Sequence, residues 1–274
     1  FSVELRDMDL PLFDMHVHST CSDGPATPEE LLYMAQSYGL SMFSITDHDS
    51  VEAYDEILRI YEAGNFPDKL VYVPGVELTT QSKVDHSCQH MCCYFPFMAI
   101  ANRWPVEMNF EGQHLVIEKP IMTEYQQCQY RLFQEKLLKA RMYRSGRIVQ
   151  MLKNVNENMN LHLSVDEFCE QNQIDPVTYM PKSAVGRPHL ARFLVRHGLS
   201  KSVNECFKTI LSEDGPNFIS TDYDYLEDMA KRLSVFGGKC IIAHPNLEMT
   251  QISKIKKVVF SALESGVIGI EKYH

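Results

Sequence analysis

The sequence predicts an α/β protein in which short parallel strands alternate with helices. Three observations support this fold class. Apolar runs alternate with amphipathic helix patterns over residues 12–76 and again over residues 239–270. Histidines and carboxylates follow the ends of the apolar runs, and the middle of the chain shows helix patterns alone. With 274 residues, 45% of them hydrophobic and 23% charged, the chain can bury a catalytic-sized core and does not have the composition of a disordered protein.

The first elements follow one another in strand and helix order. Residues 12–18 are predicted to form a strand that runs into a polar loop. Thr27 caps the next helix, Pro28 suits its first turn and Glu30 completes a capping box, while Gly39 is placed to end it. A strand, a helix and a third strand are then predicted at residues 40–45, 51–63 and 70–76.

The middle of the chain departs from this alternation. Residues 96–126 show no clean periodicity and contain the only tryptophan, Trp104, which indicates an insertion with its own local structure. Apolar spacing predicts a long amphipathic helix over residues 125–155. Shorter helices are predicted at residues 165–170, 188–197, 202–211 and 223–236. The alternation returns with a strand, a helix and a last strand at residues 239–243, 251–264 and 267–270.

Charge and cysteine content narrow the partners and the compartment. Lys plus Arg number 26 and Asp plus Glu number 36, so the formal charge of -10 disfavours binding to duplex DNA. The sequence has neither a basic start before an apolar stretch nor a run of 18 apolar residues, which predicts no membrane partner. The eight scattered cysteines are expected to be mostly buried thiols in a reducing compartment, so we expect a cytoplasmic location.

Histidines and carboxylates gather where strands are predicted to end. Because the carboxyl ends of parallel strands lie at one face of a sheet or barrel, these side chains are expected to converge. Alternate residues of a strand share a face, and two imidazoles on one face with nearby carboxylates suit a first-row divalent metal. The residues at the strand ends are His16, His18, Asp47, His48, Asp49, Glu77 and His244.

Each of these residues also has a structural interpretation. Taken alone, the pair His16 and His18 fits chance or a surface position, but repetition at four strand ends argues for a site. Asp23 adds an oxygen ligand from the loop, and an aspartate beside His48 either orients an imidazole or caps a helix. Burying Glu77 after an apolar run would be costly without a partner, and a bridging metal removes that cost better than a plain salt bridge.

The segment 85–93 allows two interpretations. In an extended conformation, His86, Cys88, His90 and Cys92 share one face, which would permit a separate zinc site. The favoured interpretation is a strand from which only His90 reaches the main site, while the cysteines pack as small hydrophobic residues.

The segment 185–190 is a candidate anion site. A helix begins at Pro188, Gly186 permits close backbone approach, and Arg187 can bind a phosphate together with the helix N-terminus. The alternative is an ordinary helix start with a surface arginine. A phosphate loop of the GxxxxGK type and a Gly-x-Ser-x-Gly elbow are both missing from the sequence, which argues against P-loop and serine-hydrolase chemistry.

Taken together, these segments resemble the polymerase and histidinol phosphatase (PHP) family. More narrowly, they resemble its stand-alone metal-dependent phosphoesterases, which act on nucleotides and short oligonucleotides. The resemblance spans residues 12–274 apart from 96–126. It is carried by residues 14–19, 22–24, 45–49, 74–79, 186–189 and 243–245.

The resemblance implies a distorted (β/α)7 barrel formed by residues 1–95 and 236–274, with residues 96–235 as an inserted, mainly helical subdomain that caps the substrate. It also implies two or three divalent ions, Mn2+, Fe2+ or Zn2+, with Glu77 bridging two of them. The implied ligands are His16, His18, Asp23, His48, Glu77, His90 and His244. Family members supply a further Asp-x-His pair after the last strand, and this sequence stops at His274 before reaching it. Either that pair lies outside this sequence, or the site lacks those ligands.

The predicted function is that of a metal-dependent phosphoric ester hydrolase acting on a nucleotide or a short single-stranded oligonucleotide. A nucleoside bisphosphate phosphatase and a 5′-3′ exoribonuclease both fit. Arg187 and His189 would hold the substrate phosphate, and His189 or Asp47 is the candidate proton donor to the leaving oxygen. Two alternatives stay open: a histidinol-phosphate-type phosphatase, and a non-catalytic metal-binding module with a decayed site.

Overall fold

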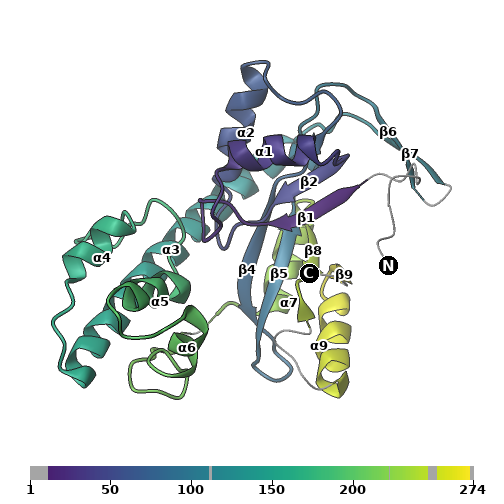
Figure 1. Ribbon diagram of the computed structural model, residues 1–274. Helices are drawn as coiled ribbons and strands as arrows, with labels where there is room; N and C mark the ends of the chain where they lie inside the picture. The colour runs from purple at the N-terminus through teal and green to yellow at the C-terminus, as the bar shows by residue number, and fades with distance from the viewer. Residues whose placement is uncertain (1–11, 111–112, 222, 246–251, 272–274) are drawn as a thin grey trace, which may run out of the picture.

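Two sheets contain the strands whose ends carry the predicted metal-binding histidines and carboxylates (Figure 1). The computed structural model describes residues 12–110, 113–221, 223–245 and 252–271. Strands β1 (Phe13–Val17), β2 (Met42–Ile45) and β3 (Val71–Tyr72) form a parallel sheet in the order β1-β2-β3. The second sheet has the order β4-β5-β8-β9, and its strands are β4 (Gly75–Gln81), β5 (Cys88–Tyr94), β8 (Lys239–Ile242) and β9 (Val267–Ile270).

The two sheets meet at the site and depart from the predicted strands in two ways. The single strand predicted at residues 70–76 is two strands, because Pro74 lies between them and cannot donate a ladder hydrogen bond. The parallel arrangement is wrong at β5, which runs antiparallel to both β4 and β8. A bridge between His48 and Glu77 joins the end of β2 to β4.

Helices α1 (Pro28–Ser37) and α2 (Ala53–Glu62) cover the first sheet (Figure 1). Their apolar faces pack against Phe43 and Tyr72 of that sheet. The predicted capping box is confirmed, since the Thr27 hydroxyl accepts from the Glu30 backbone and the Glu30 carboxylate accepts from the Thr27 backbone. Gly39 follows the helix with a φ of 69°, a conformation that glycine adopts without strain.

A second core forms on the other sheet. Helix α7 (Leu226–Val235), helix α9 (Ile252–Glu264) and the first half of α3 (Glu124–Met159) supply its helical side. Val76 and Phe95 from the sheet side pack in this core with Phe133 and Leu137 of α3. The long helix predicted at residues 125–155 is therefore confirmed, and its first half packs in the core of the second sheet.

The second half of α3 belongs to a separate helical core. Ile148 and Val155 of α3 pack there with the short helices that follow. These helices are α4 (Val165–Gln171), α5 (Arg187–Arg196) and α6 (Val203–Lys208). The helices predicted in this region are confirmed; α4 and α5 lie within one residue of the predicted bounds, and α6 and α7 are shorter than predicted. Helix α7 packs on the second sheet. The division into residues 96–235 and the remainder stays a prediction.

The segment without periodicity contains a hairpin. Strands β6 (Val106–Phe110) and β7 (Gln113–Ile117) pair with each other and project away from the helical core (Figure 1). Within the described ranges, every helix is too short or too polar to cross a bilayer. All eight cysteines lie in these ranges as free thiols, five of them buried.

The capping box should contribute measurable stability to α1. This helix follows directly after the loop that carries the predicted ligands His18 and Asp23. We predict that Thr27→Ala lowers the free energy of unfolding by about 1 kcal/mol, because it removes the hydroxyl that satisfies a backbone N–H. Urea denaturation of the chelated protein measures this. Ser37→Ala, at the other end of α1, is the control, and equal losses in the two variants would contradict the capping role.

Candidate metal centre

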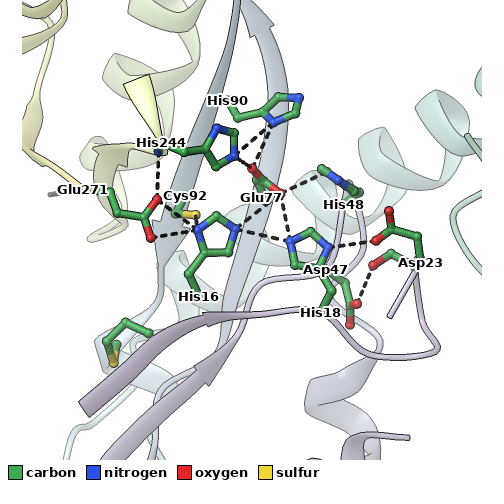
Figure 2. A network of polar contacts seen from close by, with 12 residues as sticks. His16, His18, Asp23, Asp47, His48, Glu77, His90, Cys92, His244 and Glu271 are labelled. Atoms are coloured by element: carbon green, nitrogen blue, oxygen red, sulfur yellow. Dashed lines mark hydrogen bonds and ion pairs between the residues drawn. The ribbon is translucent and has the colours of Figure 1, made fainter. Parts of the chain in front are cut away.

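Glu77 lies at the centre of a histidine cluster (Figure 2). Its side chain is 1% exposed, so its charge needs partners. One carboxylate oxygen, Oε1, lies 2.7 Å from His244 Nε2 and 3.0 Å from His90 Nδ1. These two nitrogens lie 3.3 Å apart, so Glu77 Oε1 and the two imidazoles form one tight group.

The other oxygen of Glu77 faces three different histidines. Oε2 lies 3.4 Å from His16 Nε2, 3.0 Å from His18 Nε2 and 3.1 Å from His48 Nδ1. His16 Nε2 and His18 Nε2 are themselves 3.2 Å apart. The two oxygens of one carboxylate therefore address two separate sets of imidazole nitrogens.

Backbone pairing sets these positions. Thr79 pairs with His90 and Glu77 with Cys92 in the β4–β5 ladder, so these four side chains lie on one face of the sheet. The backbone around His48 is tied to Glu77, since Asp49 N donates to Glu77 O at 2.9 Å and Glu77 N donates to Asp47 O at 3.1 Å. His90 thus reaches the site from the middle of an antiparallel strand.

Glu271 is a site residue that sequence reasoning missed. It follows β9 directly, its Oε1 lies 3.2 Å from His16 Nδ1, and its Oε2 accepts from the His244 backbone at 2.8 Å. The rule that found Glu77, a carboxylate immediately after a strand, would also have found Glu271. Cys92 Sγ lies 3.6 Å from His16 Nδ1, but Cys92 packs in a buried apolar cluster, and His90 is the β5 residue found in a candidate metal-binding group among the described residues.

Asp47 holds the loop that follows β1. Its carboxylate is buried and accepts from Ser19 N at 2.7 Å, Ser19 Oγ at 2.6 Å and Ser22 Oγ at 2.5 Å. Burial raises the pKa of Asp47 in spite of these three hydrogen bonds. These contacts describe an acceptor that fixes the loop and favour no role as a proton donor to substrate.

The same loop carries Asp23, whose Oδ1 lies 2.9 Å from His18 Nδ1. A Cβ on Gly24, the next residue, would collide with the His18 backbone, so the loop needs glycine there. Burial alone would raise the pKa of Asp23, but the hydrogen bond to His18 and the nearby histidines lower it well below its usual value. Asp23 is placed either to bind an ion or to orient the His18 ring.

Neighbouring imidazoles have opposite pKa shifts. Burial lowers the pKa of His18, but its contacts with Asp23 and Glu77 outweigh burial and raise the pKa to about 10. At His48 burial prevails over the attraction of Glu77, and the pKa falls to about 3. His48 is therefore a neutral imidazole at pH 7, the form in which histidine binds metals.

The donor set fits divalent ions. His48 Nδ1 is buried 3.1 Å from Glu77 Oε2 and has no hydrogen-bond partner among the described residues. Donor atoms 2.7–3.4 Å apart match the spacing of ligands that each lie about 2.1 Å from a shared ion. Three groups have donor atoms close enough to share an ion: His16, His18 and Glu77; His18, Asp23 and His48; and His48, Glu77 and His90.

The alternative zinc site on the segment 85–93 is not supported by these groups. Among the described residues, these three groups include neither His86 nor Cys88. Cys88 is exposed while Cys92 is buried, so the two cysteines do not share an environment. The structure thus favours a single cluster around Glu77.

A cavity of about 190 Å³ lies beside the cluster. Asp23, His48 and His90 line its metal side, and Arg187 and His189 line it from α5. Arg187, which was predicted to bind the substrate phosphate, already forms a salt bridge, since its Nη1 lies 2.8 Å from Glu213 Oε1. Its guanidinium also lies over the rings of Phe207 and Phe218.

Two further arginines of the cavity come from α3 and were missed. Arg144 pairs with Asp49 and donates to Thr79 Oγ1 at 2.9 Å, and Arg147 donates to Ile219 O at 2.9 Å. Burial lowers the pKa of Arg147, and the nearby charges of Arg144 and Arg187 lower it further. A gathering of like charges favours an anion in the cavity. The sequence pattern that could have identified these two arginines is their spacing, since arginines at 141, 144 and 147 interrupt the apolar stripe of the helix.

His189 is held as a neutral donor. Its Nδ1 accepts from Gly186 N at 3.2 Å, which leaves the proton of the neutral ring on Nε2. Burial and the charge of Arg192 lower the pKa of His189 to about 4. A neutral imidazole N–H suits hydrogen bonding to a phosphate oxygen better than proton transfer.

The fold and the cluster define a class of protein. It comprises α/β proteins in which strands gather histidines and carboxylates into a centre suited to several metal ions, next to a cationic cavity. A family model described as the PHP domain matches residues 14–182. The chain belongs to the PHP domain family, as its motifs had indicated.

Relatives with curated functions support this assignment. The 5′-3′ exoribonuclease Rnm of Escherichia coli K12 is 26% identical over 257 residues, which are 90% of this chain and 70% of that protein. The 3′,5′-nucleoside bisphosphate phosphatase of Chromobacterium violaceum is 21% identical over 94% of this chain and 75% of its own. A crystal structure of a candidate metal-dependent phosphoesterase from Bifidobacterium adolescentis has the same fold. Its TM-score is 0.65 at 20% identity, covering 95% of this chain and 77% of that one.

Glu77 should determine whether metal is retained. We predict that Glu77→Gln weakens metal binding by more than about tenfold, because the amide keeps the volume of the side chain but loses the charge that two sets of imidazoles share. Elemental analysis after dialysis against metal-free buffer measures the ions retained. Glu30→Gln, which preserves the capping box of α1, is the control, and wild-type metal content in Glu77→Gln would contradict the bridging role.

Proposed function

We propose that this chain is a metal-dependent phosphoesterase that hydrolyses phosphate esters of nucleotides or short oligonucleotides. One observation carries the proposal: a buried carboxylate in contact with five histidines lies beside a cavity with three arginines. Two relatives support it by their names, since one is an exoribonuclease and the other a nucleoside bisphosphate phosphatase. Both activities break phosphate esters.

The metal centre would hold two or three ions of the Mn2+, Fe2+ or Zn2+ type. His16, His18, Asp23, His48, Glu77, His90 and His244 are the proposed ligands, and Glu77 would bridge, because its two oxygens face different imidazoles. Glu271, which contacts His16, joins them as a ligand or as an orienting carboxylate. The two sheets would be parts of the distorted (β/α)7 barrel that the family resemblance implies.

Bound divalent ions would supply the Lewis acid that activates water and neutralises phosphoryl charge at neutral pH. The protein side chains do the rest. Arg144, Arg147 and Arg187 would bind the non-bridging oxygens and hold the phosphate against the histidine side of the cavity. The Nε2–H of His189 would donate to another oxygen and fix the orientation of the ester.

Location and partners follow from composition. The substrate would be small or single-stranded, because a cavity of about 190 Å³ admits no duplex and the chain carries a charge of -10. A membrane partner is not expected. A cytoplasmic location, in keeping with eight free thiols, stays a prediction.

Chelation and ligand removal test the proposed activity. We predict that the metal-loaded protein releases inorganic phosphate or mononucleotide from adenosine 3′,5′-bisphosphate or a short RNA. Exhaustive chelation should abolish this activity, and so should His16→Ala combined with His18→Ala. Because these histidines lie at the end of β1, circular dichroism should show a folded double variant.

The alternatives are outcomes of the same assay. Faster phosphate release from histidinol phosphate than from the nucleotides would support the histidinol-phosphate-type phosphatase. Two or more tightly bound ions without turnover on either substrate would support the non-catalytic module. Hydrolysis that survives chelation would refute the proposal itself.

Asp47 tests the division between positioning and proton transfer. We predict that Asp47→Ala lowers the free energy of unfolding by about 2 kcal/mol, because it leaves the buried Ser19 N–H without an acceptor. Metal affinity should fall as the loop carrying Asp23 loosens, while the pH profile of kcat keeps its shape. A Ser19→Ala and Ser22→Ala double variant is the matched control and should reproduce part of the effect. Loss of one limb of the pH profile with unchanged metal affinity would instead identify Asp47 as the acid.

A further inference from the structure

Two ion pairs join α3 to the segment that follows β2. Arg144 pairs with Asp49, and Arg141 Nη2 lies 2.8 Å from Glu52 Oε1. The two arginines are three residues apart, so they lie on one face of the helix. The two carboxylates are also three residues apart, and the segment 49–52 is therefore fastened to α3 at both of its ends.

Three of these four side chains are shielded from water. Arg144 and Asp49 are 15% and 10% exposed, and Arg141 is 5% exposed. Nε and Nη1 of Arg141 have no hydrogen-bond partner in the described part of the chain, and its charge is compensated by Glu52. Removing one partner of a buried ion pair leaves a charge that water compensates poorly. The attachment to α3 therefore depends on all four charges being present.

The same segment is also fixed to the sheet. Asp49 has a φ of 47°, a conformation that residues other than glycine rarely adopt, so its surroundings must hold this turn. The Asp49 backbone N donates to Glu77 O at 2.9 Å, while its carboxylate pairs with Arg144. Arg144 also donates to Thr79 Oγ1 at 2.9 Å, and Thr79 lies opposite His90 in the β4–β5 ladder. One guanidinium thus joins this segment to the strand pair that carries Glu77 and His90.

The position of His48, the residue before this segment, affects two candidate ion sites. His48 belongs to two of the three donor groups, one with His18 and Asp23 and the other with Glu77 and His90. Metal ligands have to be held within about 0.5 Å of their binding position. A loosened backbone at the next residue would therefore weaken both groups.

We propose that Asp49 and Glu52 are positioning residues for His48. They act through Arg144 and Arg141, which hold the backbone that sets the direction of the imidazole toward the shared carboxylate. The helical region would then help to build the metal centre as well as to line the substrate cavity. This inference rests on the metal centre of the proposed function and is independent of turnover.

Carboxylate-to-amide substitutions test the positioning role. Asp49→Asn and Glu52→Gln keep the size of each side chain and remove its charge, and neither residue is a proposed metal ligand. The chelated full chain is titrated with Co2+ in phosphate-free buffer, and the affinity and the visible absorption bands of the bound Co2+ are measured. Asp55→Asn and Glu62→Gln make the same chemical changes at exposed residues of α2 and are the matched controls.

Asp49→Asn and Glu52→Gln should each weaken Co2+ binding about tenfold, the usual effect of losing a group that orients a metal ligand. The absorption bands should change as well, because a displaced imidazole alters the ligand field of the ion. Both controls should match the wild-type chain. Wild-type Co2+ affinity and absorption bands in Asp49→Asn and Glu52→Gln would overturn the proposal, even if their resistance to urea fell.

Arg144 provides a second test, which still decides if Asp49→Asn does not fold by circular dichroism. Arg144→Gln should reproduce the loss of Co2+ affinity, and Arg144→Lys, which keeps the charge, should retain most of the affinity. Asp49→Asn combined with Arg144→Gln should lose no more than either single variant, because both changes remove one ion pair. Wild-type affinity in Arg144→Gln, or a combined loss equal to the product of the two single losses, would overturn the proposal. Failure of the proposed function would be seen separately, as absence of phosphate ester hydrolysis by the wild-type chain with Co2+ bound.

Discussion

The arrangement depends on the burial of one negative charge. Glu77 is almost inaccessible, and a carboxylate there would be costly without compensation. Five imidazoles reach it, His16 and His90 from strands β1 and β5 and the other three from the segments that follow β1, β2 and β8. Their contacts keep the pKa of Glu77 well below its usual value in spite of burial, which raises it. The strand order, the glycine beside the first loop and the bridge from His48 to β4 all serve to bring those imidazoles to one point.

Much of this could be predicted from sequence because the relevant physics is local. These local patterns, each within a few neighbouring residues, are a strand that ends in a polar residue, a Thr-Pro-Glu-Glu helix start and an alternating histidine pair. As predicted, the carboxylate of Glu77 is in contact with His16, His18, His48 and His244. His90 was also expected at the site from the alternation in its own segment, although the position that it takes there depends on strand pairing.

The remainder depends on long-range packing. The reversed direction of β5 is set by its pairing with β4 and β8, which no local pattern encodes. Arg144 and Arg147 lie on a helix far along the chain and reach the cavity only because α3 crosses it. Asp47 looked like a site residue because it neighbours His48, yet its carboxylate turns to the serines of another loop. Glu271 followed the same rule as Glu77 and was simply not singled out.

The continuity of α3 has a mechanical consequence. One helix of 36 residues has its first half in the core of the second sheet and its second half in the core of the helical region. A rigid rod anchored at both ends resists hinge motion between the two regions, since bending it would break helical hydrogen bonds and disturb both cores. We therefore expect the opening above the histidines to keep a fixed width. Selection among ligands would then depend on which molecules are narrow enough to pass through that opening, and not on the closure of a lid.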